Sequence, residues 1–132
     1  MEYNGWENIN KMNKEFIPYE QALELKELGF DEPCLDCYNH KGNLWGMRLD
    51  QQSTVDNACL APTYQQAFRW IRENYGYNCF ITSSIIDGKW YYFRENLNNR
   101  KYDSEPELTP KFETYEEAEI NCLKTLIEIV KK

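Results

Sequence analysis

The chain has 132 residues, of which 42% are hydrophobic and 15% aromatic, and its formal net charge is −7. The length is typical of one domain with its own core, and the composition excludes an intrinsically disordered chain. The charge argues against a general binder of nucleic acid or membrane surfaces, because phosphate and anionic lipid repel an acidic protein unless basic side chains are segregated. Segregation is present: residues 51–100 carry four Asp or Glu against five Lys or Arg. We expect a single globular domain over residues 1–132.

The sequence predicts a protein that stays in the cytoplasm with its thiols reduced. No stretch approaches the ~20 consecutive apolar residues of a membrane span, and the start, MEYNGWENIN, lacks the basic and apolar regions of a secretory signal. The five cysteines are an odd number, which favours reduced thiols over a disulfide framework. Most of them are expected to act as small buried hydrophobic groups.

Three helices are predicted from a recurring opening, Tyr-x-x-Ala, in which acidic or amide side chains occupy the first turn after a Thr or Pro. The first covers residues 18–28 and ends at Gly29, because glycine adopts the left-handed conformation that terminates helices. The second covers residues 63–75, carries a wide apolar face and ends at Gly76. The third covers residues 115–130, and apolar side chains recur along it at helical spacing.

Two β-hairpins are predicted between the helices. The paired segments are residues 34–40 with 44–49 and residues 79–85 with 89–95. The first turns at Lys41-Gly42-Asn43 and the second at Asp87-Gly88, which supplies the positive backbone angles of a tight primed turn. Residues 50–60 and 97–111 are rich in Asn, Asp, Ser and Pro and are predicted to be loops.

The resulting order of elements is α-ββ-α-ββ-α. It lacks the β-α-β alternation that builds a parallel nucleotide-binding sheet, and adjacent strands favour antiparallel pairing with helices on one face. The predicted fold class is therefore α+β, as a single domain of three helices packed on antiparallel hairpins.

The clearest metal-ligand pattern is Cys34-x-x-Cys37-x-x-His40, with Cys59 available as a fourth ligand. Zinc favours thiolate and imidazole ligands in tetrahedral sets. Structural zinc sites normally recruit a second closely spaced pair, which this chain lacks, and residues 34 and 37 of a strand point to opposite faces. We therefore interpret these cysteines as incidental hairpin thiols and predict no metal and no other cofactor.

No catalytic constellation is recognisable in the sequence. Gly-rich phosphate loops, Gly-x-Ser-x-Gly, His-Glu-x-x-His and the calcium-loop pattern are absent from it. The only histidine, His40, falls in a predicted turn, and adjacent carboxylates such as Glu116 and Glu117 do not face one another on a helix. The chain is predicted not to be an enzyme, with a small zinc-dependent protein as the alternative.

The remaining constellation is basic and aromatic. On a strand, Trp90, Tyr92 and Arg94 share one face, and Lys89, Tyr91 and Phe93 share the other. One face belongs to the core, and the other could present the aromatic and guanidinium groups that are enriched at protein interfaces and on single-stranded RNA platforms. The favoured, simpler interpretation is ordinary strand aromatics with snorkelling cations. The candidate partner-binding residues are Arg69, Arg72, Lys89, Trp90, Tyr92, Arg94 and Arg100.

Three segments carry a resemblance to known proteins: MNKEFIPYEQALELKELGFDEPC (12–34), APTYQQAFRWIRENYG (61–76) and TYEEAEINCLKTLIEIVKK (114–132). Through them the chain resembles a group of small proteins from phages and prophages of Bacteroidetes bacteria. The matching motifs are helix entries and core stripes, which carry no chemistry. Because these proteins begin near Met12, the resemblance implies that residues 1–11 are an extension or flexible segment. The set of Cys34, Cys37 and His40 does not look like a shared feature.

The resemblance implies a setting more than a mechanism. Small acidic phage proteins without catalytic motifs are often inhibitors of host defence, which is an analogy at the level of class. It implies a non-catalytic anti-CRISPR or anti-defence inhibitor in the host cytoplasm that binds a nuclease effector, such as an RNA-targeting type VI nuclease, or its RNA complex. An acidic surface can engage the basic nucleic-acid channel of such an enzyme. The alternative is a small RNA-binding accessory module that uses the basic and aromatic residues.

Overall fold

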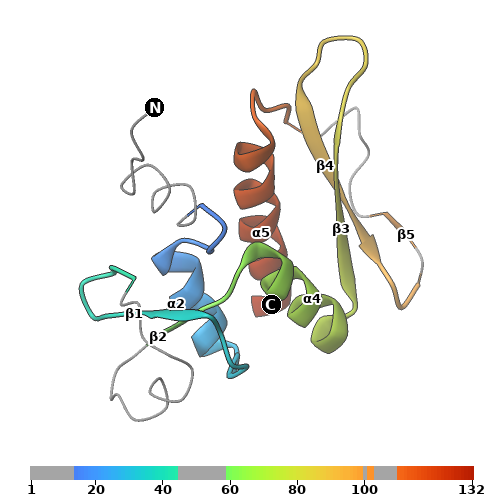
Figure 1. The fold of residues 1–132 in the computed structure, drawn as a ribbon. Coiled ribbons are helices and arrows are strands. Elements are labelled where there is room, and N and C mark those ends of the chain that lie inside the picture. Colours follow the sequence, from blue (N-terminus) through green and yellow to red (C-terminus); the bar gives the residue numbers. More distant parts are fainter. Residues whose placement is uncertain (1–13, 45–58, 100, 103–109) are drawn as a thin grey trace, which may run out of the picture. The chain divides into compact units, whose positions relative to one another are not determined.

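The structure is a computed structural model that describes residues 14–44, 59–99, 101–102 and 110–132 (Figure 1). Its helices and strands are α2 (Tyr19–Glu27), β1 (Asp36–Tyr38), β2 (Cys59–Ala61), α4 (Tyr64–Tyr75), β3 (Tyr77–Ser83), β4 (Trp90–Asn96), β5 (Lys101–Tyr102) and α5 (Tyr115–Lys131). The predicted α+β class and the order α-ββ-α-ββ-α are confirmed, and the strand pairs are antiparallel. Within the described residues, no helix combines the length and the apolar character that crossing a membrane requires.

The chain divides into two compact units, residues 1–67 and 68–132, with the boundary inside α4. The first unit contains α2 and the pair β1–β2, and the second contains β3, β4, β5 and α5. The expectation of one domain over the whole chain stays a prediction.

The helix boundaries follow from local capping, as the sequence predicts. Thr63 and Thr114 each accept a hydrogen bond on the side-chain oxygen from the amide three residues further on, at 3.2 Å in both cases. These bonds satisfy amides that have no partner inside the first turn. Gly29 and Gly76 follow α2 and α4 with φ of 101° and 75°, a conformation that opposes continuation of a helix. Each predicted helix therefore agrees with the structure to within one residue at either end.

In the first unit, the partner of β1 differs from the prediction. The predicted turn is present, since Tyr38 and Leu44 form an antiparallel bridge, but residues 45–49 lie outside the described residues. Residues 36–38 pair with 59–61, so the loop predicted over residues 50–60 is wrong at its end. Residues 50–58 are mostly polar in the sequence, whereas the strand Cys59–Ala61 is apolar. Cys59 and Ala61 can therefore be buried. Residues 50–58 lie outside the described part of the chain.

The core of the first unit lies between α2 and the β1–β2 pair. Ile17 and Leu25 are completely buried, and Ala22 and Phe30 are nearly so. The Tyr38 hydroxyl donates a hydrogen bond of 2.6 Å to the carbonyl oxygen of Ile17, so this phenol is satisfied inside the core.

The second unit is built on the β3–β4 hairpin, in the register Phe80 opposite Phe93. The predicted hairpin is confirmed, but the tight two-residue turn at Asp87-Gly88 is wrong, because pairing ends at Ser83 opposite Trp90 and the loop covers residues 84–89. Local hydrogen bonds hold this wider loop: the Gly88 amide donates to the Ser84 carbonyl oxygen at 2.9 Å, and the Lys89 amide donates to the Asp87 carboxylate at 3.0 Å.

The predicted loop over residues 97–111 also contains a short paired segment. Lys101 and Tyr102 form β5, which pairs antiparallel with the end of β4. Two residues are too few to leave an alternating pattern in the sequence, so the prediction is wrong at this point. Residues 103–109 lie outside those that the structure describes.

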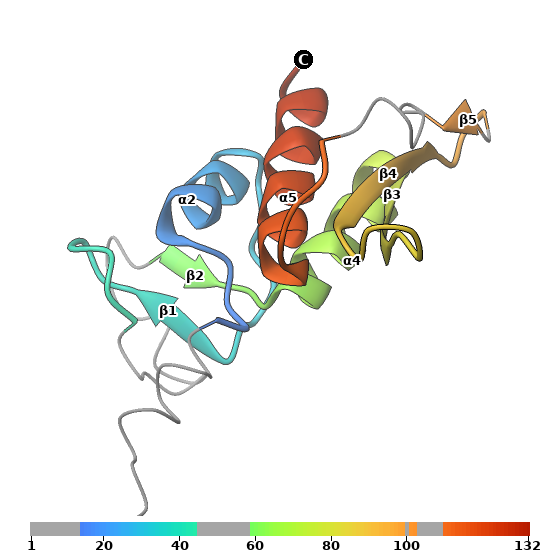
Figure 2. The same cartoon turned by 90° about the horizontal axis from the view of Figure 1, so that it is seen from above.

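Helix α5 packs beside the hairpin (Figure 2) and supplies most of the buried residues of the second unit. Its buried residues are Ala118, Cys122, Leu123, Leu126 and Ile127. Helical spacing also predicts that Ile129 and Val130 are buried, but the structure leaves both half-buried.

A disulfide joins Cys79 on β3 to Cys122 on α5, with the two Cα atoms 7.1 Å apart. The expectation that all the cysteines are reduced thiols is therefore wrong for this pair. The odd cysteine count obscured it, because residues separated by 43 positions in the sequence meet only when the helix packs on the hairpin. Cys34, Cys37 and Cys59 are free and buried.

Candidate partner-binding surface

The inner face of the hairpin carries the aromatic residues that the sequence analysis proposed for binding. Tyr92 is 5% exposed and stacks on Phe112 with ring centres 6.1 Å apart. Trp90 meets the ring of Tyr115 edge-on at 5.3 Å. Since Trp90, Tyr92 and Arg94 share this face, their assignment to an open stacking surface is corrected: they face the core of the second unit.

Arg94, on the same face, has a buried polar atom without a hydrogen bond among the described residues. The residue is half-buried opposite Cys79, and the buried atom is its Nε. An arginine in this position packs through the aliphatic part of its side chain. It does not project from the surface as a free contact.

The other predicted binding residues are dispersed. Arg69 and Arg72 are exposed on α4, and Lys89 is exposed in the hairpin loop, where its Nζ atom lies 3.4 Å from the Glu113 carboxylate. Arg100 lies outside the described residues. The candidate residues that the structure describes therefore do not form one basic and aromatic platform.

The outer face of the hairpin is partly open and has two phenylalanines at its centre. Phe80 stacks on Phe93 with ring centres 5.2 Å apart, and 38% of Phe80 remains exposed. Thr82 and Tyr91 are the next pair along the same face and are half-buried. This face ends at the loop of residues 84–89.

The most exposed apolar side chains that the structure describes are at the loop itself. Ile85 and Ile86 are 101% and 97% exposed, and we call them the apolar tip. The tip is the free end of the hairpin, away from the β5 end (Figure 1). The sequence does not predict this tip, because isoleucine before Asp-Gly is typical of a paired strand and Ile85 is therefore predicted to be a strand residue. The sequence does carry a signal: Ile85 and Ile86 are adjacent and both apolar, so the alternation of apolar and polar residues that marks a strand is lost before Asp87.

An ion pair fixes the loop next to the apolar tip. The Lys111 ammonium lies 2.8 Å from the Asp87 carboxylate, and this hydrogen bond, assisted by the Lys89 amide, lowers the pKa of Asp87 to about 2. Because the folded-state pKa lies below the unfolded one, the contribution to stability is present at neutral pH and is lost as pH falls toward 2.

The Lys111→Gln variant is expected to raise the pKa of Asp87 toward its ordinary value, because the largest cause of the shift is removed. NMR titration of the Asp87 carboxyl carbon measures it, with Lys124→Gln on the exposed side of α5 as the control. An unchanged pKa in Lys111→Gln would contradict the ion pair.

The three free thiols are buried, and burial lowers the reactivity of a thiol. Burial is the largest cause that raises the pKa of Cys34, to about 12, and it also raises the pKa values of Cys37 and Cys59. A thiol that stays protonated at neutral pH is a poor nucleophile. His40 is exposed in its turn, and among the described residues no three His, Cys, Asp or Glu side chains are grouped to hold a metal ion.

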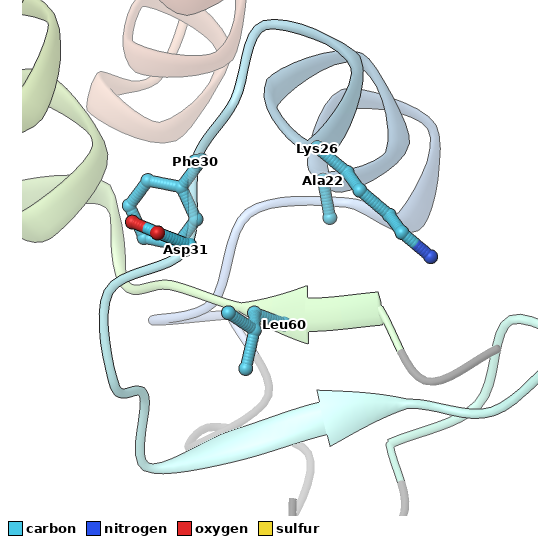
Figure 3. Close-up of a pocket in the computed structure, with 5 residues that line it drawn as sticks. All are labelled: Ala22, Lys26, Phe30, Asp31 and Leu60. Atoms are coloured by element: carbon cyan, nitrogen blue, oxygen red, sulfur yellow. The ribbon is translucent and has the colours of Figure 1, made fainter. Parts of the chain in front are cut away.

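A small cavity of about 230 Å³ lies beside α2 in the first unit (Figure 3). Its lining residues are Ala22, Lys26, Phe30, Asp31 and Leu60. In Figure 3 the Lys26 ammonium points away from Phe30 and Asp31, so the two charges do not converge on one point. The volume is below the ~300–1,000 Å³ of typical ligand pockets. We therefore place the candidate site on the hairpin.

Comparison of the chain with protein-family models, with curated proteins and with solved structures found no match. No family and no activity are therefore transferred to it from another protein, and the resemblance to small phage proteins stays a prediction. The candidate site rests on the geometry of the hairpin alone.

Proposed function

We propose that the protein acts by binding another protein, with the apolar tip as the main contact. The observation that carries this proposal is the full exposure of two adjacent isoleucines, Ile85 and Ile86. Burying an isoleucine side chain is favourable by roughly 1.5–3 kcal/mol relative to leaving it in water. A partner with an apolar pocket recovers this free energy for both side chains.

The loop beneath the apolar tip supports the proposal, because hydrogen bonds within the chain restrain it. The Ser84 amide donates to the Lys89 carbonyl oxygen at 2.8 Å, and the Ser84 hydroxyl accepts from the Ile86 amide at 3.3 Å. The ion pair of Asp87 and Lys111 adds a further restraint. A preorganised loop loses less conformational entropy on binding than a flexible one.

The partner that we propose is a defence nuclease of a bacterial host, such as an RNA-targeting CRISPR effector, which the protein inhibits without catalysing a reaction. The net charge of −7 supports this choice, because an acidic protein is attracted to the basic channel of a nuclease. The resemblance to small phage proteins points to the same setting. The raised pKa values of the free thiols support a non-catalytic role.

Affinity purification of the tagged protein from defence-proficient host cells tests the proposal. The wild-type chain is expected to recover a stoichiometric protein partner, and the double variant Ile85→Asp/Ile86→Asp is expected to bind it roughly 100-fold more weakly, because about 1.4 kcal/mol corresponds to tenfold. Leu35→Asp is the matched control: Leu35 is 72% exposed in the first unit, so the same substitution there is expected to leave binding unchanged.

Two outcomes would count against the proposal. Recovery of no partner from any defence-proficient host contradicts the function, and equal binding by the double variant contradicts the role of the apolar tip. Recovery of RNA in place of protein, with affinity that falls steeply as salt rises, would favour the RNA-binding module instead.

A further inference from the structure

Among the residues that the structure describes, strand β3 is an edge of its sheet. The order of strands is β3-β4-β5, so β3 has one neighbour in the part of the chain that the structure describes. Its sequence, YNCFITS, contains no charged residue and no proline. Natural edge strands normally carry such residues, or are very short, because a free edge is a template for another strand.

The hydrogen bonds at the two ends of the hairpin show which backbone groups of β3 point outward. The Ser84 amide donates to the Lys89 carbonyl oxygen, and the Leu97 amide donates to the Gly76 carbonyl oxygen, both at 2.8 Å. Bonded and non-bonded pairs alternate along an antiparallel ladder. The even-numbered residues between Gly76 and Ser84 therefore bond to β4, and the odd-numbered ones direct their N–H and C=O groups away from it.

Those outward residues are Tyr77, Cys79, Ile81 and Ser83. In the described part of the chain, no backbone group outside the β3–β4 ladder bonds to them. Four amides and four carbonyls thus lie along the edge with regular strand spacing. This is the array that strand addition uses.

Phe80, at the centre of β3, supplies the matching side-chain surface. It lies on the outer face, stacks on Phe93 and keeps 38% of its surface exposed. If a second β3 is placed antiparallel with Phe80 at the two-fold axis, Cys79 of each copy faces Ile81 of the other and exchanges both hydrogen bonds with it. The two Phe80 residues then form a non-bonded pair, in which side chains approach most closely.

We propose that two copies of this chain form a dimer by antiparallel pairing of their β3 strands about Phe80. A second copy is the occupant that fits, because this pairing is two-fold symmetric. The outward N–H and C=O groups of each β3 meet those of the other, and the two Phe80 side chains meet at the axis. Two chains of net charge −7 repel each other, and β3 is a segment through which they meet without opposing like charges. This interface is separate from the apolar tip.

Light scattering of the size-separated protein over a range of concentrations tests the dimer. The wild-type chain is expected to have twice the chain mass. Ser83→Pro is expected to raise the dissociation constant about tenfold or more, since each copy loses one outward N–H bond and no bond to β4. Ser83→Ala keeps that N–H and is the matched control, expected to dimerise like the wild type. Circular dichroism verifies that both variants fold.

A charge exchange at Phe80 tests the register. Phe80→Glu and Phe80→Lys are each expected to be monomeric, because like charges meet at the two-fold axis, and their equimolar mixture is expected to form a heterodimer. The variant Ile85→Asp/Ile86→Asp is expected to remain dimeric, which separates this inference from the proposed function. A monomeric wild type at every concentration, a Ser83→Pro variant that dimerises like Ser83→Ala, or a mixture that stays monomeric would overturn the proposal.

Discussion

The Leu126→Ala variant is expected to lower the free energy of unfolding by about 2–5 kcal/mol. Leu126 is 1% exposed and lies one turn beyond Cys122, on the face of α5 that packs against the hairpin. Truncation removes its transfer free energy and leaves a cavity, because surrounding side chains relax only partly. Since whole domains are stable by about 5–15 kcal/mol, this single change removes a large part of the total.

Urea denaturation followed by circular dichroism measures the effect. Glu128→Ala is the matched control, because Glu128 is exposed on the same helix and its truncation is expected to change stability by less than about 0.5 kcal/mol. A loss below about 1 kcal/mol in Leu126→Ala would mean that this face of α5 is not the core of the second unit.

Removal of the disulfide in Cys79→Ala/Cys122→Ala is expected to lower the free energy of unfolding by about 2–4 kcal/mol. The bond closes a loop between residues 43 positions apart, and its loss gives the unfolded chain more conformational freedom. It also releases β3 from α5, so the effect belongs to the second unit. Denaturation with and without a reducing agent measures it.

The control for the disulfide is internal. A reducing agent is expected to destabilise the wild type to about the level of the double variant and to leave the double variant unchanged. Titration of thiols in denaturant is expected to find three before reduction and five after it. Five thiols before reduction would contradict the bond.

The sequence predicts features that are decided within a few residues. The starts of α4 and α5 depend on Thr63 and Thr114, and the ends of α2 and α4 depend on glycines one or two residues after them, so local pattern is sufficient. Strand β2 depends on a partner more than 20 residues earlier in the chain, which no local pattern encodes. The pairing of Cys79 with Cys122 is non-local for the same reason.

The sequence predicts the hairpin itself, but Trp90, Tyr92 and Arg94, which it offers for binding, lie on the face that packs against the core of the second unit. Alternation along residues 89–94 separates two faces and does not say which one is buried. That choice is made by α5, which packs on β4, and by Phe112, which stacks on Tyr92. The apolar tip is not predicted from the sequence, because Asp-Gly suggests a tight turn. The loop is wider than that turn, so Ile85 lies in the loop and not in the strand.

The shielding of the free thiols makes the protein convenient for spectroscopy. Cys34, Cys37 and Cys59 are buried with raised pKa values, and the other two cysteines are consumed in the disulfide. Maleimide reagents react with exposed thiolates, so they discriminate against every native cysteine. A fluorophore or spin label can therefore be attached at Ile86 through Ile86→Cys, within the proposed contact, with every other residue unaltered.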